Sequence, residues 1–382
     1  MLNLKDTWWL NLSNVQILIS LLSFFLPTQL ALHLNSFNST VYGFQIDYLI
    51  PTIYLTDIIS LLIIVLGLRK YKFTKLNFIL IIIYLGFVAI NINYSLLIIP
   101  AIYKWIKVTE MLLLGIMILN YKKFDVFKNF VKPLSYSIFI ACLLGIWQFL
   151  IKGSVGGVFY WFGERDFLFS NPNIAPYPYS FFSHPNSFAG FLLVFGIFLL
   201  QFKNNFNPRY FGTLLALIVI NLVLTNYLNV YITICLLLIL KLNKLSSLSF
   251  VLIDFSQRFV THRIELIKAS LQLIKENFWF GVGLNNFIPN LVKVSNTFVN
   301  AWELQPVHNI FLLVFSETGI VGLIIFCFLI FSGFSLLTLN YSLLTILITG
   351  LSDHYWLTLQ QNILLFVFVL VTSRIGKIKH TV

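Results

Sequence analysis

Charged residues are scarce in this sequence, and their scarcity excludes an ordinary soluble domain. Only 10% of the 382 residues are Asp, Glu, Lys or Arg, whereas 59% are hydrophobic. Soluble domains have about 25% charged and about 45–50% apolar residues. The composition therefore predicts an all-α polytopic membrane protein in which residues 1–382 form a single integral membrane domain.

Cysteine patterns and clusters of metal ligands are also lacking. The three cysteines, Cys142, Cys235 and Cys327, lie in separate apolar runs, without the spacing of a disulfide framework or a metal site. We interpret them as small buried hydrophobic side chains. No cluster of acidic residues points to a bound ion, so we expect neither a metal nor another cofactor.

Acidic residues are few compared with basic ones, 13 against 25, which gives a net charge of +12. In a soluble protein this excess would suggest nucleic acid, but in a membrane protein Lys and Arg mark cytoplasmic loops, so no nucleic-acid partner is expected. The basic segments RKYKFTK, YKKFDVFKNFVK and RIGKIKH therefore predict the cytoplasmic side of the plasma (inner) membrane. Residues 35–48, 152–184 and 256–307 then form extracytoplasmic loops.

Long apolar runs are abundant, and a spanning helix needs about 20 mostly apolar residues. The chain must cross once more to reach the external loop 256–307, and only residues 245–254 are available for that crossing. We therefore expect a thinned or broken helix there, or else the candidate spans 210–226 and 228–240 together form one crossing plus a re-entrant piece. This predicts about 12 transmembrane helices. No internal repeat is visible, which counts against a secondary transporter. The candidate spans are 14–34, 49–68, 76–93, 95–119, 133–151, 185–202, 210–226, 228–240, 308–333, 335–351 and 357–373.

The segment PVHNIFLLVFSETGIVG places His308 and Asn309 at the start of a predicted membrane helix. On a helix, Gly319 and Gly322 lie about 20° and about 40° from His308, and Glu317 lies opposite. We therefore expect a stripe along which another helix approaches closely, and a buried interhelical contact for the glutamate. The histidine is either a base or hydrogen-bond donor, or it and the asparagine satisfy free backbone groups.

The segment RFVTHRIELIKASLQLIKENFWFGVGLNNF predicts an amphipathic helix that ends at a Gly-Val-Gly turn. Such a helix, within the loop 256–307, would lie on the external membrane face. Arg263 near its start either contacts lipid headgroups or a neighbouring helix, or binds a ligand. The apolar side of this helix carries Ile264, Ile267, Leu271 and Ile274.

The segment YPYSFFSHPNSFAGFLL contains the step His184, Pro185, Asn186. Proline suits the first turn of a helix. This step predicts a cap and a helix start at the beginning of the span 185–202, and a direct role of the histidine is the alternative.

Ionisable residues inside predicted spans are costly and usually face a partner or a cavity. Lys107 and Glu110 are three residues apart and are expected to pair. Alternatively, Lys104 or Lys107 lines a polar cavity. Asp353 and His354 lie at a predicted external turn, where the aspartate caps a helix or orients a histidine or an acceptor hydroxyl.

The spacing His-Asn, nine residues, Gly, two residues, Gly resembles the signature of the O-antigen ligase family. This family includes bacterial O-oligosaccharyltransferases, and the O-antigen polymerases are its relatives. Arg263 near the start of an external helix, the following Gly-Val-Gly turn, and the His-Pro-Asn step at His184 are similar to that family too. The resemblance covers roughly residues 95–373, with its most specific part at 258–325.

This resemblance implies a metal-independent, inverting transfer of a glycan from a polyprenyl-diphosphate carrier to a lipid, glycan or protein acceptor at the outer face of the plasma membrane. It implies that His308 is catalytic and that Arg263 binds the diphosphate, which suits an always-charged bidentate guanidinium; Asn309 is expected to support them. A polymerase acting on a second lipid-linked repeat unit is the first alternative. A transporter of lipid-linked sugars, which belongs to a different class of protein and would use Lys104, Lys107 and Glu110, is the second.

The sequence departs from the family pattern at two phosphate-binding positions. Tyr177 stands where the family usually has an arginine, and Leu228 and Asn229 stand where it often has a Ser-Arg pair. Arg165, in the loop 152–184, is a candidate substitute for the first arginine, or it pairs with one of its acidic neighbours.

Overall fold

The chain forms two compact units, which are described separately. The computed structural model describes residues 14–34, 39–165, 177–242, 257–294, 300, 303–332 and 340–380. The predicted crossing at 245–254 lies outside these residues. The first unit comprises Met1–Ala31, Tyr54–Tyr71 and Leu112–Tyr227, and the second comprises Leu32–Ile53, Lys72–Met111 and Leu228–Val382.

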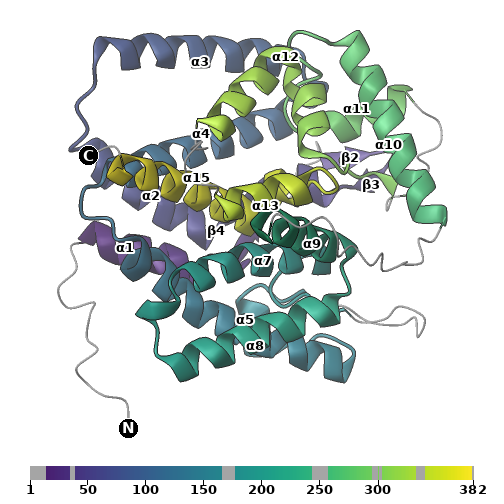
Figure 1. Ribbon diagram of the computed structural model, residues 1–382. Helices are drawn as coiled ribbons and strands as arrows, with labels where there is room; N and C mark the ends of the chain where they lie inside the picture. Colours follow the sequence, from purple (N-terminus) through teal and green to yellow (C-terminus); the bar gives the residue numbers. More distant parts are fainter. Residues whose placement is uncertain are drawn as a thin grey trace. The chain divides into compact units, whose positions relative to one another are not determined.

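The first unit is helical. Helix α1 packs against α2, α5 and the π-helix η5, and α8 packs against α5 and α7 (Figure 1). Its core is rich in fully buried phenylalanine rings. Such rings are stabilised by the close packing of a protein interior, where each buries a large apolar area. Its elements are α1 (Asn14–Phe25), α2 (Leu55–Leu68), η5 (Val126–Val131), α5 (Lys132–Ile151), α6 (Val158–Trp161), α7 (Pro185–Gln201), η6 (Lys203–Asn205) and α8 (Pro208–Thr225).

The predicted span 14–34 is wrong in its second half. Helix α1 ends at Phe25 and is followed by a turn and the short strand β1 (Ala31–His33). Pro27 accounts for the stop, because proline disfavours helical geometry in the residue before it and cannot continue the helix.

The predicted span 49–68 starts too early. Its first residues form a 3₁₀ turn, η4 (Asp47–Leu49), and the strand β4 (Thr52–Tyr54). The helix begins only at Leu55, where the Asp57 carboxylate accepts the backbone N–H of Tyr54 at 2.8 Å. A carboxylate at this position satisfies a free donor at the helix N-terminus.

Four helices of the described chain are long and apolar enough to cross a membrane by length and composition: Lys75–Asn93, Val126–Ile151, Pro208–Thr225 and Ile310–Phe331. Six shorter apolar helices accompany them. Helices occur in all eleven candidate spans, so the helical fold class is confirmed. About 12 crossings, and the extracytoplasmic side of the loops, stay predictions.

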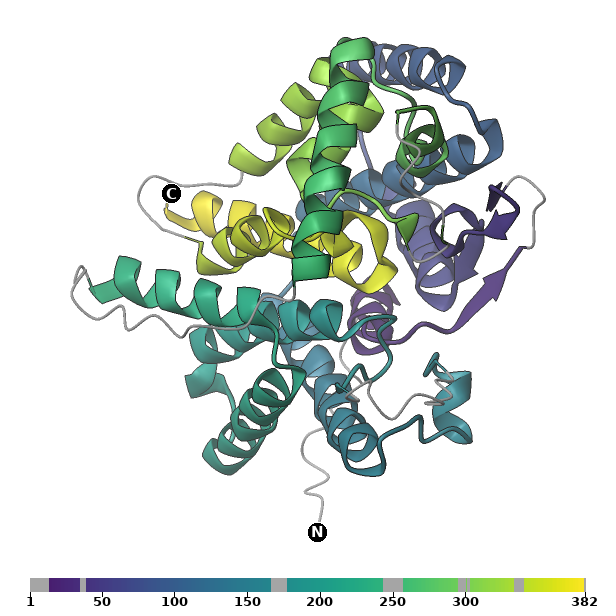
Figure 2. The same ribbon diagram turned by 90° about the vertical axis from the view of Figure 1, so that its right-hand side faces the viewer.

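The second unit contains the two long helices α3 and α4 and the C-terminal helices. Helix α10, mid-green in Figure 2, packs against α11 and α12, and α13 packs against α9, α14 and α15. The strands β2 and β3 form a hairpin with Thr40 opposite Gln45. The remaining helices and strands are β2 (Thr40–Val41), β3 (Phe44–Gln45), α3 (Lys75–Asn93), α4 (Ile98–Asn120, which runs on into the first unit's residues), α9 (Leu228–Leu242), α10 (Gln257–Glu276), α11 (Phe287–Val294), α12 (Ile310–Phe331), α13 (Tyr341–Gly350), α14 (Tyr355–Thr358) and α15 (Gln360–His380).

Helix α10 has two distinct apolar faces. Leu266 and Leu273 are buried in a core with residues of the β2–β3 hairpin, α11 and α12. Ile264, Ile267 and Leu271 are 45%, 39% and 54% exposed. The predicted apolar row thus faces away from the protein for three of its four members, as a helix lying on a membrane surface requires.

The predicted glycine stripe below His308 is wrong. Helix α12 is kinked at Gly319, whose φ of 67° and ψ of −172° are not helical. A Cβ atom at this position would overlap the Trp279 carbonyl group. The glycine therefore accommodates the loop after α10 and not a neighbouring helix, and the kink ends the regular spacing that related His308 to Gly322.

Asn91, fully buried in α3, ties this loop to two long helices. Its Nδ2 donates to the carbonyl oxygens of Phe280 (2.7 Å) and Glu317 (2.9 Å). Its Oδ1 accepts from the Trp105 indole N–H (2.9 Å) and from the backbone N–H of Leu284 (2.9 Å). These four hydrogen bonds use both donors and both acceptor positions of the amide. One side chain therefore fixes α3, α4, α12 and the Gly-Val-Gly turn together.

Candidate active site

Asn309 positions the start of α12. Its extended backbone makes it the N-cap residue, and its Oδ1 accepts the backbone N–H groups of Phe311 (2.9 Å) and Leu312 (3.0 Å). Its Nδ2 donates to the carbonyl oxygen of Leu351 at 3.0 Å. The same amide thus satisfies free donors of the helix and holds the turn at residues 351–354 against it.

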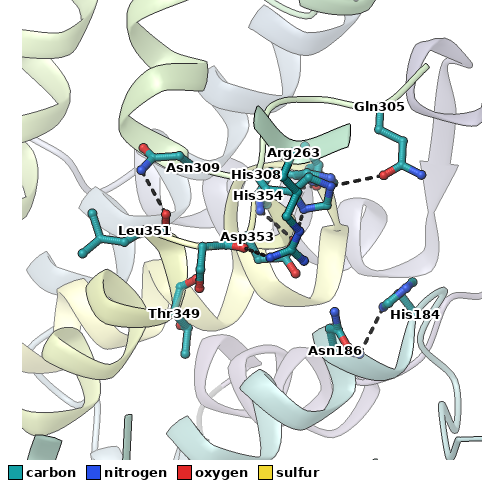
Figure 3. A network of polar contacts seen from close by, with 12 residues as sticks. His184, Asn186, Arg263, Gln305, His308, Asn309, Thr349, Leu351, Asp353 and His354 are labelled. Carbon is teal, nitrogen blue, oxygen red and sulfur yellow. Dashed lines mark hydrogen bonds and ion pairs between the residues drawn. The ribbon is translucent and has the colours of Figure 1, made fainter. Parts of the chain in front are cut away.

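His308 directly precedes this cap and lies against that turn. Its Nδ1 is 3.5 Å from the Asp353 Oδ1, and its ring centroid is 5.0 Å from that of His354 (Figure 3). Its Nε2 is 3.2 Å from the Gln305 Oε1. Side chains from two different segments therefore face the two nitrogens of the imidazole.

The proton position on His308 decides what this arrangement can do. With the proton on Nδ1, Asp353 orients the ring and Nε2 carries the lone pair of a general base. With the proton on Nε2, the Gln305 carbonyl oxygen accepts it, and the lone pair of Nδ1 faces the carboxylate. Nδ1 is buried and has no partner at hydrogen-bond geometry among the described residues, so its contact with Asp353 has the length of an ion pair but not the alignment of a hydrogen bond.

Asp353 belongs to this histidine cluster. Its Oδ1 accepts the backbone N–H of His354 at 2.8 Å as well as facing His308. The following helix α14 has His354 at its N-cap position, without a side-chain capping bond. Of the two roles predicted for the aspartate, the geometry favours orienting a histidine.

His354 is buried and tightly surrounded. Its Nδ1 is 2.9 Å from the Thr358 Oγ1, and the Tyr48 ring meets its ring edge-on at 5.5 Å between centroids. The Thr358 hydroxyl also donates to the His354 carbonyl oxygen at 3.2 Å. The side chain therefore has a fixed orientation next to His308.

Arg263 reaches the same turn from α10. The side chain is half-buried, and its Nη1 donates to the carbonyl oxygen of Ser352 at 3.4 Å. Figure 3 shows the guanidinium among the side chains of His308, Asp353 and His354. A permanent positive charge thus lies at the turn that carries Asp353, which suits an anionic substrate group.

Two further predicted residues lie in the first unit. His184 is the N-cap of α7, where its Nδ1 accepts the backbone N–H of Asn186 at 3.1 Å and Pro185 occupies the first turn. Its predicted cap is confirmed. Arg165 is exposed, and its carbonyl oxygen accepts the hydroxyl of Tyr179 at 3.1 Å.

Arg165 follows a carboxylate that has a structural role. Glu164 is buried and accepts from the Gln148 side chain (2.8 Å) and from the backbone N–H groups of Val155 (2.7 Å) and Gly156 (2.8 Å). These contacts hold the loop after α5 in place and leave the arginine next to a shallow pocket lined also by Ser154 and Tyr160.

The charged side chains of α4 have identifiable contacts within the second unit. The Lys104 ammonium donates to the carbonyl oxygen of Leu357 at 2.8 Å. Lys107 Nζ is 4.0 Å from Glu110 Oε2, and both side chains are buried. This is the pair predicted from their spacing.

Glu317 makes the interhelical contact expected of it. Its carboxylate accepts the backbone N–H of Phe287, the first residue of α11, at 3.3 Å. A negative charge at a helix N-terminus is favourable, and Lys104 interacts electrostatically with it. The carboxylate therefore fixes α11 against α12 and takes no part in the histidine cluster.

Gln305, Tyr48 and Thr358 escaped the sequence predictions, and His354 was noticed only as part of a turn. For His354, the one signal in the sequence was that an aspartate directly precedes it, at residue 353. Nothing local marks the other three, because their partners lie elsewhere in the fold.

The apolar helices and the comparison with known proteins point to the same class of protein. Four described helices have the length and composition of membrane-spanning helices, which suggests an integral membrane protein. Residues 184–327 match the family model described as O-antigen ligase, so the predicted resemblance is confirmed over that range. His184, Arg263 and His308 lie within the match, whereas Arg165 and Asp353 lie outside it. None of the curated proteins compared with the chain matches it. The match supports a glycosyltransferase of the O-antigen ligase or polymerase type.

Proposed function

We propose that this protein transfers a glycan from a polyprenyl-diphosphate carrier to an acceptor hydroxyl at the outer face of the plasma membrane. The observation that carries the proposal is the grouping of Arg263, His308 and Asp353, two of which lie in the segment that matches the O-antigen ligase family. A cation, an imidazole and a carboxylate are the groups that such a transfer needs.

The reaction is a displacement at the anomeric carbon. The acceptor oxygen forms a bond to that carbon, the bond from the carbon to the diphosphate oxygen breaks, and the diphosphate leaves on the polyprenyl carrier. Attack opposite the leaving group inverts the anomeric centre. Since the glycosyl phosphoester is already activated, orientation and charge stabilisation are the main contributions of the protein, and the reaction needs no metal ion.

His308 and Arg263 have separate roles in this reaction. His308 takes the hydroxyl proton on Nε2, with Asp353 holding the proton on Nδ1, and the acceptor hydroxyl takes the place that Gln305 occupies next to Nε2. Arg263 neutralises the departing diphosphate. Asn309 keeps His308 at the helix start. Arg165 and His184 are candidates for further contacts with the donor.

The acceptor distinguishes a ligase from a polymerase. A ligase uses a lipid, protein or other envelope polymer, whereas a polymerase uses another lipid-linked repeat unit. The matching family model is described as O-antigen ligase, and we place the ligase reaction first. Lys104 and Lys107 are engaged in contacts within the protein, which weighs against the transporter that would use them.

The test is to delete the gene in its host, resolve surface glycans by size, and complement with wild type and with His308→Ala. Full-length glycan that stays on its carrier and is missing from the surface identifies a ligase. Glycan shortened to single repeat units identifies a polymerase. Full complementation by His308→Ala would contradict the catalytic assignment.

A further inference from the structure

Three potential metal ligands converge beside the start of α12. His308 precedes that helix, and Asp353 and His354 precede α14. One ligand atom of each side chain lies within 4.8 Å of the ligand atoms of the other two. The carboxylate and the second imidazole are buried, and the first imidazole is 16% exposed.

The hydrogen bonds around His354 fix its tautomer. The Thr358 hydroxyl donates its one hydrogen to the His354 carbonyl oxygen, which can only accept. The Thr358 Oγ1 therefore accepts from the His354 Nδ1–H at 2.9 Å. In the neutral ring the lone pair is then on Nε2, which can act as a ligand atom only in this tautomer.

His308, like His354, faces a side-chain oxygen with one of its ring nitrogens. Its Nε2 faces the Gln305 Oε1 at 3.2 Å, and a carbonyl oxygen accepts a hydrogen bond. In the tautomer that this contact favours, the lone pair is on Nδ1, which is buried, lacks a hydrogen-bond partner among the described residues, and faces the Asp353 Oδ1 at 3.5 Å. An imidazole lone pair and a carboxylate oxygen repel each other unless a positive charge lies between them.

We propose that His308, Asp353 and His354 bind a divalent transition-metal ion of the zinc class. Two imidazoles and one carboxylate, with a position left for water, are typical ligands of Zn²⁺ and its neighbours, whereas Mg²⁺ and Ca²⁺ prefer oxygen ligands. In metal sites the second nitrogen of a ligating imidazole usually donates to a fixed acceptor. Gln305 and Thr358 are such acceptors.

Arg263 sets the strength of this site. Its guanidinium hydrogen-bonds to Ser352, one residue before Asp353, and it is always protonated. It therefore opposes a dication and favours an anion at the same place. Removing its charge strengthens metal binding and weakens binding of a diphosphate.

The bound ion inhibits glycan transfer, a consequence that rests on the proposed function. A metal on Nδ1 of His308 leaves the proton on Nε2, and that nitrogen then cannot take a proton from the acceptor. The proposed reaction itself is independent of metal, so the ion acts as an inhibitor that competes with the catalytic tautomer. Binding of the ion does not depend on that consequence.

Binding is measured with the full chain, purified in detergent without a polyhistidine tag and stripped of metal. Co²⁺ is added while visible absorption is followed, and Zn²⁺ is then used to displace it. We expect one Co²⁺ per chain, displacement by Zn²⁺ and no displacement by Mg²⁺. Thr358→Val should weaken binding by about 10–100-fold, His354→Asn should weaken it further, and Arg263→Gln should tighten it.

The matched control is His33→Ala, which removes an imidazole that pairs with Thr52 outside the cluster; its affinity should equal that of the wild type. Because His354 is buried, each variant is first compared with the wild type by size-exclusion profile and thermal unfolding. Zn²⁺ should raise the unfolding temperature of wild type and not of folded His354→Asn.

Absence of stoichiometric binding to the wild type would overturn the proposal, since it would mean that a proton lies between His308 and Asp353 in place of a metal. Equal affinity in wild type, His354→Asn and Thr358→Val would overturn it as well. Metal binding in a protein that transfers no glycan would support the site and count against the proposed function alone.

Discussion

Replacing Gly319 by alanine should destabilise the protein strongly. Its φ of 67° and ψ of −172° lie in a region that costs a non-glycine residue about 1–3 kcal/mol. Relief of the overlap between the new Cβ and the Trp279 carbonyl displaces the loop after α10. That movement breaks two backbone hydrogen bonds, Ile320 to Phe278 and Val282 to Ser316, both of 2.9 Å, each contributing about 0.5–1.5 kcal/mol. The expected loss in free energy of unfolding is about 2–6 kcal/mol.

The assay is thermal unfolding of the purified protein in detergent, followed by intrinsic fluorescence. Gly86→Ala is the matched control, because Gly86 is in the middle of α3 and a Cβ there meets nothing within 4 Å. It should be neutral or stabilising by about 0.5–1 kcal/mol. Unfolding of Gly319→Ala at or above the wild-type temperature would refute the kink and the close approach of the loop.

Three other substitutions test the packing and the site. Asn91→Ala leaves four groups without their partner, three of them in buried hydrogen bonds, and should cost at least about 3 kcal/mol of unfolding free energy, measured by the same thermal assay; a neutral result would contradict its role. Asp353→Asn should lower kcat by up to about 10²–10⁴-fold with little change in KM, and a purely raised KM would argue against orientation of His308. Arg263→Lys should raise the donor KM by about 10–100-fold, since hydrogen bonds to charged groups contribute about 1.5–3 kcal/mol, whereas an unchanged donor KM would exclude the diphosphate contact.

Local patterns of the sequence predicted most of the helices. Apolar runs identified α3, α5, α7 and α8 closely, because a membrane helix satisfies its backbone within one segment. The His184-Pro185 step marked the start of α7, since a cap and a proline act locally. The strands β1 and β4 were missed because short apolar stretches beside Pro27 and Pro51 were counted into spans.

The histidine cluster was only half predictable. His308 and Asn309 were found through their spacing to glycines, although Gly319 proved to be a kink that receives a loop. The contacts of His354 and Gln305 with His308 became visible only in the fold, since contacts between residues 305–309 and 351–358 depend on how α12 packs beside α14 and the turn before it. Periodicity reports which face of a helix is apolar, not which distant side chains meet there.

The central claim is that His308 is the base of a glycan transfer. It is tested most directly with purified protein in lipid vesicles, a polyprenyl-diphosphate-linked glycan and an acceptor, with the glycosylated acceptor measured over time. The account predicts that His308→Ala lowers kcat by about 10²–10⁴-fold, that His33→Ala does not, and that both variants bind the donor like the wild type. Transfer by His308→Ala at the wild-type rate would contradict it.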